Sequence, residues 1–205
     1  MFYNDITRLC NHLCRLSVRQ LFSLNDYNHA WLPWLQGTTP EDLATSICAS
    51  ISARHADREE DFLEKLAWLY AWLIPQSSSG FSWGLYRRND SPTSSADNSV
   101  RQRFMALIDY PGCRMTHATI DTLTGIYSCI ITTDSDIWDS DRISGVFLAI
   151  WHGRPLMGVT SFGRITIGHL YRALSGVLAG PPLAQLEGTF KTFASMYAVV
   201  HDDDE

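Results

Sequence analysis

The sequence predicts an α+β fold, with helices in the first part of the chain and an antiparallel β-sheet in most of the rest. Residues 1–78 carry apolar side chains at helical spacing, whereas the apolar runs after residue 79 are short and rich in β-branched and aromatic residues. Helices followed by strands in separate parts of a chain are typical of α+β proteins. We therefore expect a helical subdomain at 1–78 and a β-rich subdomain with one helix at 79–205, packed as a single compact unit.

Three longer helices are expected in the first part of the chain. The first contains apolar residues at helical spacing from Ile6 to Leu16. The second begins with Thr39 as its N-cap and Pro40 at the first helical position, where a missing N–H costs nothing. The third opens on a cluster of acidic residues and ends at Pro75.

The rest of the chain alternates strand-like runs with breakers. We expect strands at 125–133, 144–151, 155–162 and 193–201, a helix at 166–180, and a polar surface loop at 87–99. The "HGRP" segment between the second and third of these strands is typical of a tight hairpin connection.

Composition and charge exclude several classes of function. The chain has 205 residues and a net charge of −6, which disfavours binding to nucleic acid or to an anionic membrane. Five cysteines form no regular framework, which indicates a reducing compartment, and no signal peptide is apparent. The longest apolar stretch, residues 66–74, is too short to span a bilayer. These features predict a cytoplasmic protein.

No cofactor or metal site is expected from the motifs. Cys10 and Cys14 are four residues apart on a predicted helix, but His12 between them would face away from both. The chain has no phosphate-binding glycine motif and no G-x-S-x-G serine motif. We therefore expect neither a cofactor nor a metal.

One pair of segments predicts the geometry of a thiol peptidase that lacks its thiol. A nucleophilic cysteine is activated at the N-terminus of a helix by a histidine from a distant strand. Ala30, in "NDYNHAWLPWLQG" (25–37), precedes a stretch that can form a short helix, and His152 ends the apolar run "GVFLAIWH". We expect these two residues to face each other across one cleft.

These segments resemble a known family. "NHAWLPWLQ" resembles the nucleophile motif of papain-like viral and ubiquitin-directed peptidases, with Ala30 where the family has cysteine, by natural loss or by engineered replacement. "GVFLAIWHGRPLMGVTSFGRITI" (145–167) resembles the histidine region of picornavirus leader peptidases of the foot-and-mouth disease type. The two segments cover about 35 of the 205 residues, and the family's third catalytic carboxylate has no counterpart near Gly168.

The resemblance implies a papain-like fold and a viral cysteine peptidase that processes its own polyprotein and cleaves host proteins in the host-cell cytoplasm. It also implies roles for single residues. Asn28 would help to form the oxyanion site, Ala30 would mark the nucleophile, His152 would be the base, and Trp31 would be the buried aromatic residue after the nucleophile.

Other interpretations of these residues stay open. Trp31 and Trp34, three residues apart, would anchor the core of any fold on one helix face, and His152 suits a surface turn. His117 and Asp121 form a competing pair of base and orienting carboxylate in "MTHATID".

The alternative function is a non-enzymatic viral or pathogen protein that binds a host protein and antagonises host defence. Only two of the 16 basic residues are lysines, and seven tryptophans are available as anchors. Trp83 and Trp138 are the exposed tryptophans that we expect to contact such a partner. The net charge disfavours an RNA-binding function, and the sequence leaves the oligomeric state open.

Overall fold

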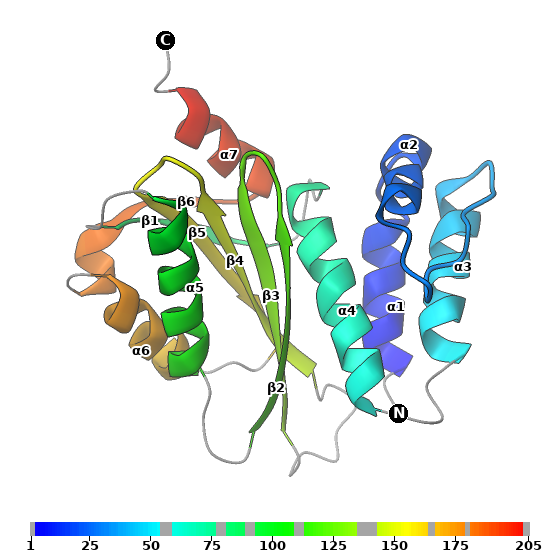
Figure 1. Cartoon of the computed structure of the whole chain (residues 1–205), viewed down its shortest axis with the longest axis horizontal. Coiled ribbons are helices and arrows are strands. Elements are labelled where there is room, and N and C mark those ends of the chain that lie inside the picture. The colour runs from blue at the N-terminus through cyan, green and yellow to red at the C-terminus, as the bar shows by residue number, and fades with distance from the viewer. Residues whose placement is uncertain are drawn as a thin grey trace.

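The computed structural model describes residues 3–53, 59–76, 81–88, 93–108, 113–134, 143–163, 167–178 and 181–202. It contains one six-stranded antiparallel sheet, in the order β2-β3-β4-β5-β1-β6, with helices on both faces (Figure 1). The predicted α+β fold is confirmed. The papain-like arrangement within that class stays a prediction.

The strands are β1 (Trp83–Arg87), β2 (Cys113–Asp121), β3 (Gly125–Asp134), β4 (Ile143–Trp151), β5 (Leu156–Phe162) and β6 (Leu186–Phe190). Strand β4 lies inside the sheet, and all of its residues are buried, as its nearly continuous apolar sequence requires. β2–β3, β3–β4 and β4–β5 are hairpins between neighbouring strands, whereas the connection from β1 to β2 crosses the sheet.

The helices are α1 (Tyr3–Leu13), α2 (Val18–Phe22), α3 (Pro40–Ala53), α4 (Glu59–Leu73), α5 (Ser94–Ile108), α6 (Ile167–Val177) and α7 (Phe193–His201). Short 3₁₀ helices are η1 (Ser23–Tyr27), η2 (Ile74–Gln76) and η3 (Pro182–Gln185). No helix in the described part of the chain is both long and apolar enough to cross a membrane.

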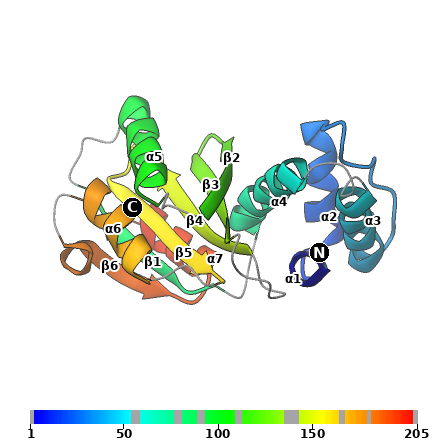
Figure 2. The same ribbon diagram turned by 90° about the horizontal axis from the view of Figure 1, so that it is seen from below.

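The sheet is covered on both faces. Helices α5 and α6 pack on one face, where Phe104 and Leu174 meet Ile130 and Leu148 of the central strands. Helices α4 and α7 cover the other face, and α1–α3 pack against the side of α4 that faces away from the sheet (Figure 2). One continuous core therefore runs from the N-terminal helices through α4 to the sheet.

Most of the predicted elements are confirmed. Strands β3, β4 and β5 match the ranges expected at 125–162, and α6 matches the helix expected at 166–180. Helix α3 begins at Pro40, and the hydroxyl of Thr39 accepts a hydrogen bond from the backbone N–H of Asp42 at 3.2 Å. The predicted N-cap and first helical residue therefore lie where the sequence placed them.

The strand predicted at 193–201 is wrong, because this segment forms helix α7. Its β-branched and aromatic residues favour a strand by composition, but three buried residues, Phe193, Met196 and Val200, repeat at helical spacing. Thr192 caps the helix through its side chain, which accepts from the N–H of Ser195 at 3.1 Å. The cap and the spacing together outweigh the local strand propensity.

The polar loop predicted at 87–99 is also wrong in part. Helix α5 begins at Ser94, and the hydroxyl of Thr93 accepts from the N–H of Ala96 at 3.2 Å, as an N-cap does. Residues 89–92 lie outside the described residues. The described part of 79–205 thus contains the helices α5, α6 and α7 instead of the single helix expected.

The helix predicted to begin at residue 30 is wrong. Asn28 has φ +47°, a left-handed conformation that ends η1, and residues 28–38 form no helix. The side chain of Asn25 accepts from the N–H of Leu35 at 3.0 Å and closes the segment into a loop. Trp31 is half-buried and Trp34 is 71% exposed, so they share no helix face in the core.

Candidate functional site

The structure does not bring the residues of the predicted peptidase site together. Asn28 and Ala30 line a hollow of about 230 Å³ formed by the loop at 24–34, and His152 is not among its lining residues. His152 lies in the β4–β5 turn, on the sheet side of α4, whereas the loop lies with α1–α3 (Figure 1). No helix N-terminus lies at residue 30 to activate a thiol there. The assignment of a catalytic role to these residues stays a prediction.

The aromatic residues around Ala30 attach their loop to α4. The rings of Tyr27, His29 and Trp31 all contact Trp68 of that helix edge-on, at centroid distances of 5.0, 4.3 and 5.8 Å. His29 is half-buried by these contacts. Trp31 therefore packs against Trp68 of α4, whereas Trp34 is exposed.

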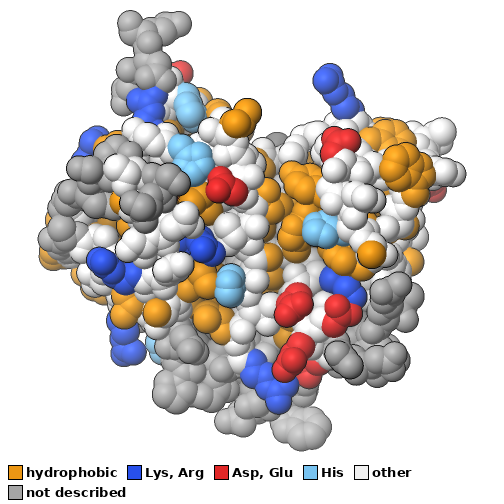
Figure 3. Space-filling model, viewed as in Figure 1, with side chains coloured by type: hydrophobic (Ala, Val, Ile, Leu, Met, Phe, Trp, Pro, Cys, Tyr) orange, Lys and Arg blue, Asp and Glu red, His pale blue; other side chains and the backbone are white. Residues whose placement is uncertain are grey.

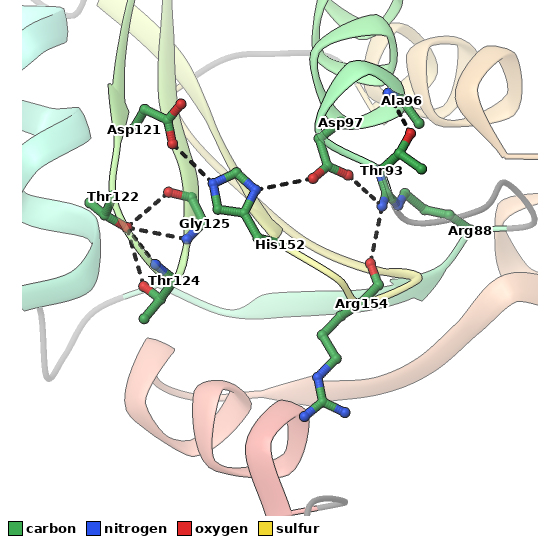
Figure 4. Close-up of polar contacts among 10 residues, drawn as sticks. All are labelled: Arg88, Thr93, Ala96, Asp97, Asp121, Thr122, Thr124, Gly125, His152 and Arg154. Atoms are coloured by element: carbon green, nitrogen blue, oxygen red, sulfur yellow. Dashed lines mark hydrogen bonds and ion pairs between the residues drawn. The ribbon is translucent and has the colours of Figure 1, made fainter.

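His152 is the centre of a polar cluster that joins four parts of the fold (Figure 4). Its Nδ1 lies 3.1 Å from Oδ2 of Asp97 in α5, and its Nε2 lies 3.0 Å from Oδ1 of Asp121 at the end of β2. Asp97 is fully buried and also accepts from the Arg88 guanidinium at 2.7 Å. Arg88 in turn donates to the carbonyl oxygen of Arg154 at 3.0 Å. The cluster connects α5, the end of β1 and the β4–β5 turn to the β2–β3 hairpin.

This geometry favours the protonated form of His152. Both ring nitrogens face carboxylate oxygens, so both can donate hydrogen bonds only when the ring is an imidazolium. The hydrogen bond to Asp121 raises the pKa of His152 above its ordinary value of 6.5, and Asp97 adds to this, while burial opposes it. A histidine held in this way clamps the structure and is poorly suited to act as a free base.

The raised pKa predicts a stability that depends on pH. A group whose pKa is higher in the folded state contributes most below its unfolded value near 6.5 and loses this contribution as pH rises through its folded value. We expect His152→Asn to lower the melting temperature more at pH 6 than at pH 8. Thermal unfolding of both proteins across this range measures the difference.

His117 provides the control for this measurement. Burial, reinforced by Arg101, lowers the pKa of His117. His117→Asn should therefore lower the melting temperature less at pH 6 than at pH 8, the opposite of His152→Asn. A difference between wild type and His152→Asn that stays constant from pH 6 to pH 8 would contradict the clamp.

The alternative pair of a histidine base and an orienting carboxylate, His117 and Asp121, is not formed either. Asp121 bonds to His152, and His117 lies four residues away on an extended strand, a separation of roughly 13 Å.

Trp83, which was expected to be exposed, is buried in the core, and Trp138 lies outside the described residues.

An aromatic pocket of about 440 Å³ lies where η1, the end of α4, the β2–β3 hairpin and α7 meet. The rings on its walls belong to Tyr27, Trp72, Tyr127, Phe193 and Tyr197. Gln76, Thr122 and Thr124 add polar groups, and no lysine or arginine of the described residues lines it. An open, mostly apolar cavity with a few polar groups is typical of a binding site. On the face shown in Figure 3, hydrophobic side chains gather in the hollow between the sheet and the N-terminal helices.

The hairpin on one side of this aromatic pocket is held rigidly. The hydroxyl of Thr122 donates to the carbonyl of Gly125 at 2.9 Å and accepts from the N–H groups of Thr124 and Gly125. The carbonyl of Thr124 accepts from the N–H of His152 at 3.2 Å. At the tip, Leu123 is 100% exposed. The His152 cluster thus fixes the hairpin that presents an apolar side chain beside the pocket.

One of the residues that line the aromatic pocket, Trp72, carries an unsatisfied donor. Trp72 is 1% exposed, and its indole N–H is buried without a hydrogen-bond partner. A buried donor in this state costs about 1–3 kcal/mol. An acceptor that reached Trp72 would recover this free energy.

Sequence reasoning missed this pocket because its walls come from four separate segments of the chain. Two signals were available: the helical spacing of Phe193, Tyr197 and Ala198, and the Thr122-x-Thr124-Gly125 turn. In the described residues, no group of three or more His, Cys, Asp or Glu side chains is arranged to hold a metal ion. No known protein-family model matches the chain, and no curated protein matches it significantly.

Proposed function

We propose that this protein is a non-enzymatic interaction protein that binds a partner polypeptide at the aromatic pocket. The observation that carries the proposal is an open, aromatic-lined cavity beside Leu123, an apolar side chain that the fold leaves fully exposed. Apolar side chains grouped around a concave site are typical of surfaces that bind other proteins.

The exposed rim favours a polypeptide over a small molecule. Besides Leu123, Tyr27 on the wall is 40% exposed and Val199, one residue beyond the lining Ala198, is 46% exposed. A ligand confined to the cavity would leave these side chains in water. A polypeptide with one side chain in the pocket and its backbone across the rim would cover them, and burial of apolar surface stabilises such a complex.

The pocket walls also need little ordering when a partner binds. The turn at Thr122–Thr124 is fixed by its own hydrogen bonds and by the His152 cluster, and Thr124 Oγ1 lies 3.0 Å from the hydroxyl of Tyr127. A surface that is ordered before binding loses less conformational entropy on association.

The experiment is a selection of random peptides, displayed on phage, against the whole chain. We expect enriched peptides that share an apolar anchor residue and that lose binding to Ala198→Trp, in which an indole fills the pocket. The same peptides should bind Ala49→Trp, an identical substitution on the exposed face of α3. No enrichment, or equal binding to Ala198→Trp and the wild type, would overturn the proposal.

A second measurement separates this proposal from the peptidase prediction. We expect Ala30→Cys to release no product from a protein fusion reporter and to react with no thiol-directed peptide probe faster than a free thiol does. Residue 30 begins no helix, and His152 donates to two carboxylates elsewhere. Cleavage that depends on both residue 30 and His152 would restore the peptidase function and count against a non-enzymatic protein.

A further inference from the structure

We propose that the partner segment is basic, with an apolar anchor in the aromatic pocket and lysine or arginine residues beside it. This inference rests on the proposed function and adds the chemistry of the partner. Its basis is the position of carboxylates next to lining residues, at a pocket that no described lysine or arginine lines.

The first carboxylate adjoins the wall formed by η1. Asp26 is exposed and immediately precedes Tyr27. Burial raises the pKa of the Tyr27 hydroxyl, and the negative charge of the neighbouring Asp26 raises it further.

The second carboxylate adjoins the wall formed by α7. Asp202 is the exposed C-cap residue of this helix, and its backbone N–H donates to the carbonyl of Ala198, a lining residue. The C-terminal end of a helix carries a partial negative charge, which adds to that of Asp202.

Asp121 is not part of this set, because it follows the lining residue Ile120 on strand β2 and points to the opposite face, where it bonds to His152. His201 at the end of α7 contacts the ring of Tyr197 and is the other titratable group of the α7 wall.

The positions of these charges select a cationic partner. Charges within about 8 Å, the Debye length at physiological salt, act on a bound segment with little screening. Complementary charges at the rim of an interface speed association and disfavour partners of like charge. An acidic segment, a nucleic acid or a second copy of this chain, which has a net charge of −6, would be repelled.

The test uses three synthetic peptides with a central phenylalanine anchor, flanked on both sides by lysine, by glutamine or by glutamate. Binding to the whole chain is followed by NMR through the indole N–H signal of Trp72, which Trp72→Phe identifies. At 0.15 M salt we expect the lysine peptide to bind about tenfold more tightly than the glutamate peptide, with the glutamine peptide between them. At 0.5 M salt the difference should fall below about threefold.

Charge variants locate the effect. Asp26→Asn combined with Asp202→Asn should weaken the lysine peptide about threefold or more and leave the glutamine peptide unchanged. Glu64→Gln on the exposed face of α4 removes a carboxylate away from the lining residues and should change neither.

The possible failures are distinguishable. Equal affinity of the three peptides would overturn the basic partner and leave the proposed function standing. Absence of any shift at the Trp72 signal with all three peptides at about 1 mM would overturn both, since an apolar anchor alone should reach weak affinity. Concentration-dependent dimerisation that shifts the Trp72 signal without peptide would assign the surface to a second copy and also overturn the inference.

Discussion

Replacing Asp97 with alanine is expected to lower the free energy of unfolding by about 3–5 kcal/mol, a large share of the total stability of a typical domain. Asp97 and Arg88 are both fully buried, and the guanidinium lies 2.7 Å from the carboxylate. Without Asp97, the buried cation of Arg88 keeps its desolvation cost and loses the carboxylate that lies 2.7 Å from it. His152 loses a partner at the same time.

Thermal or urea unfolding measures this effect, and the melting temperature should fall on the order of 10 °C. Glu187→Ala is the matched control. It breaks an exposed ion pair between Glu187 and Arg87, the residue next to Arg88. That change should cost at most about 1 kcal/mol. A small effect of Asp97→Ala, comparable with the control, would show that the buried pair does not hold α5 to the sheet.

A double variant tests the cause. Arg88→Met combined with Asp97→Ala removes both charges, so it should be more stable than Asp97→Ala alone. If the double variant loses as much as the sum of the single changes, the cost comes from packing and not from the loss of the buried ion pair.

Filling the aromatic pocket is expected to abolish binding of the selected peptides, with a loss of affinity of about 30-fold or more. Ala198 lies on the exposed side of α7 and lines the pocket, so the indole of Ala198→Trp can occupy the cavity while the helix keeps its core contacts. The helix itself should lose less than about 1 kcal/mol, because tryptophan is only a moderately poorer helix former than alanine.

Calorimetric titration of the selected peptides and thermal unfolding of the variant measure the two effects separately. Ala49→Trp carries the same change on the exposed face of α3 and should keep wild-type affinity. Unchanged affinity of a folded Ala198→Trp variant would place the binding surface elsewhere on the molecule.

Most of the secondary structure follows from local signals in the sequence. Strands β3–β5 and helices α3, α4 and α6 follow from apolar periodicity, caps and breakers, because these act over a few residues. At α7 the strand-like composition gave the wrong prediction, although the Thr192 cap and the helical spacing of Phe193, Met196 and Val200 favour the helix. Local signals failed after Asn28. Its left-handed backbone ends η1, and the residues that follow it form no helix.

Long-range packing, in contrast, sets which side chains act together. Asp97, Asp121 and His152 meet because α5, which carries Asp97 in its first turn, begins beside the β2–β3 and β4–β5 hairpins, and no spacing in the sequence encodes this. The aromatic pocket arises in the same way from four distant segments. Helical periodicity is a local property of the backbone, whereas a site depends on long-range packing. For this reason, two short segments that resemble a peptidase do not by themselves place Ala30 beside His152.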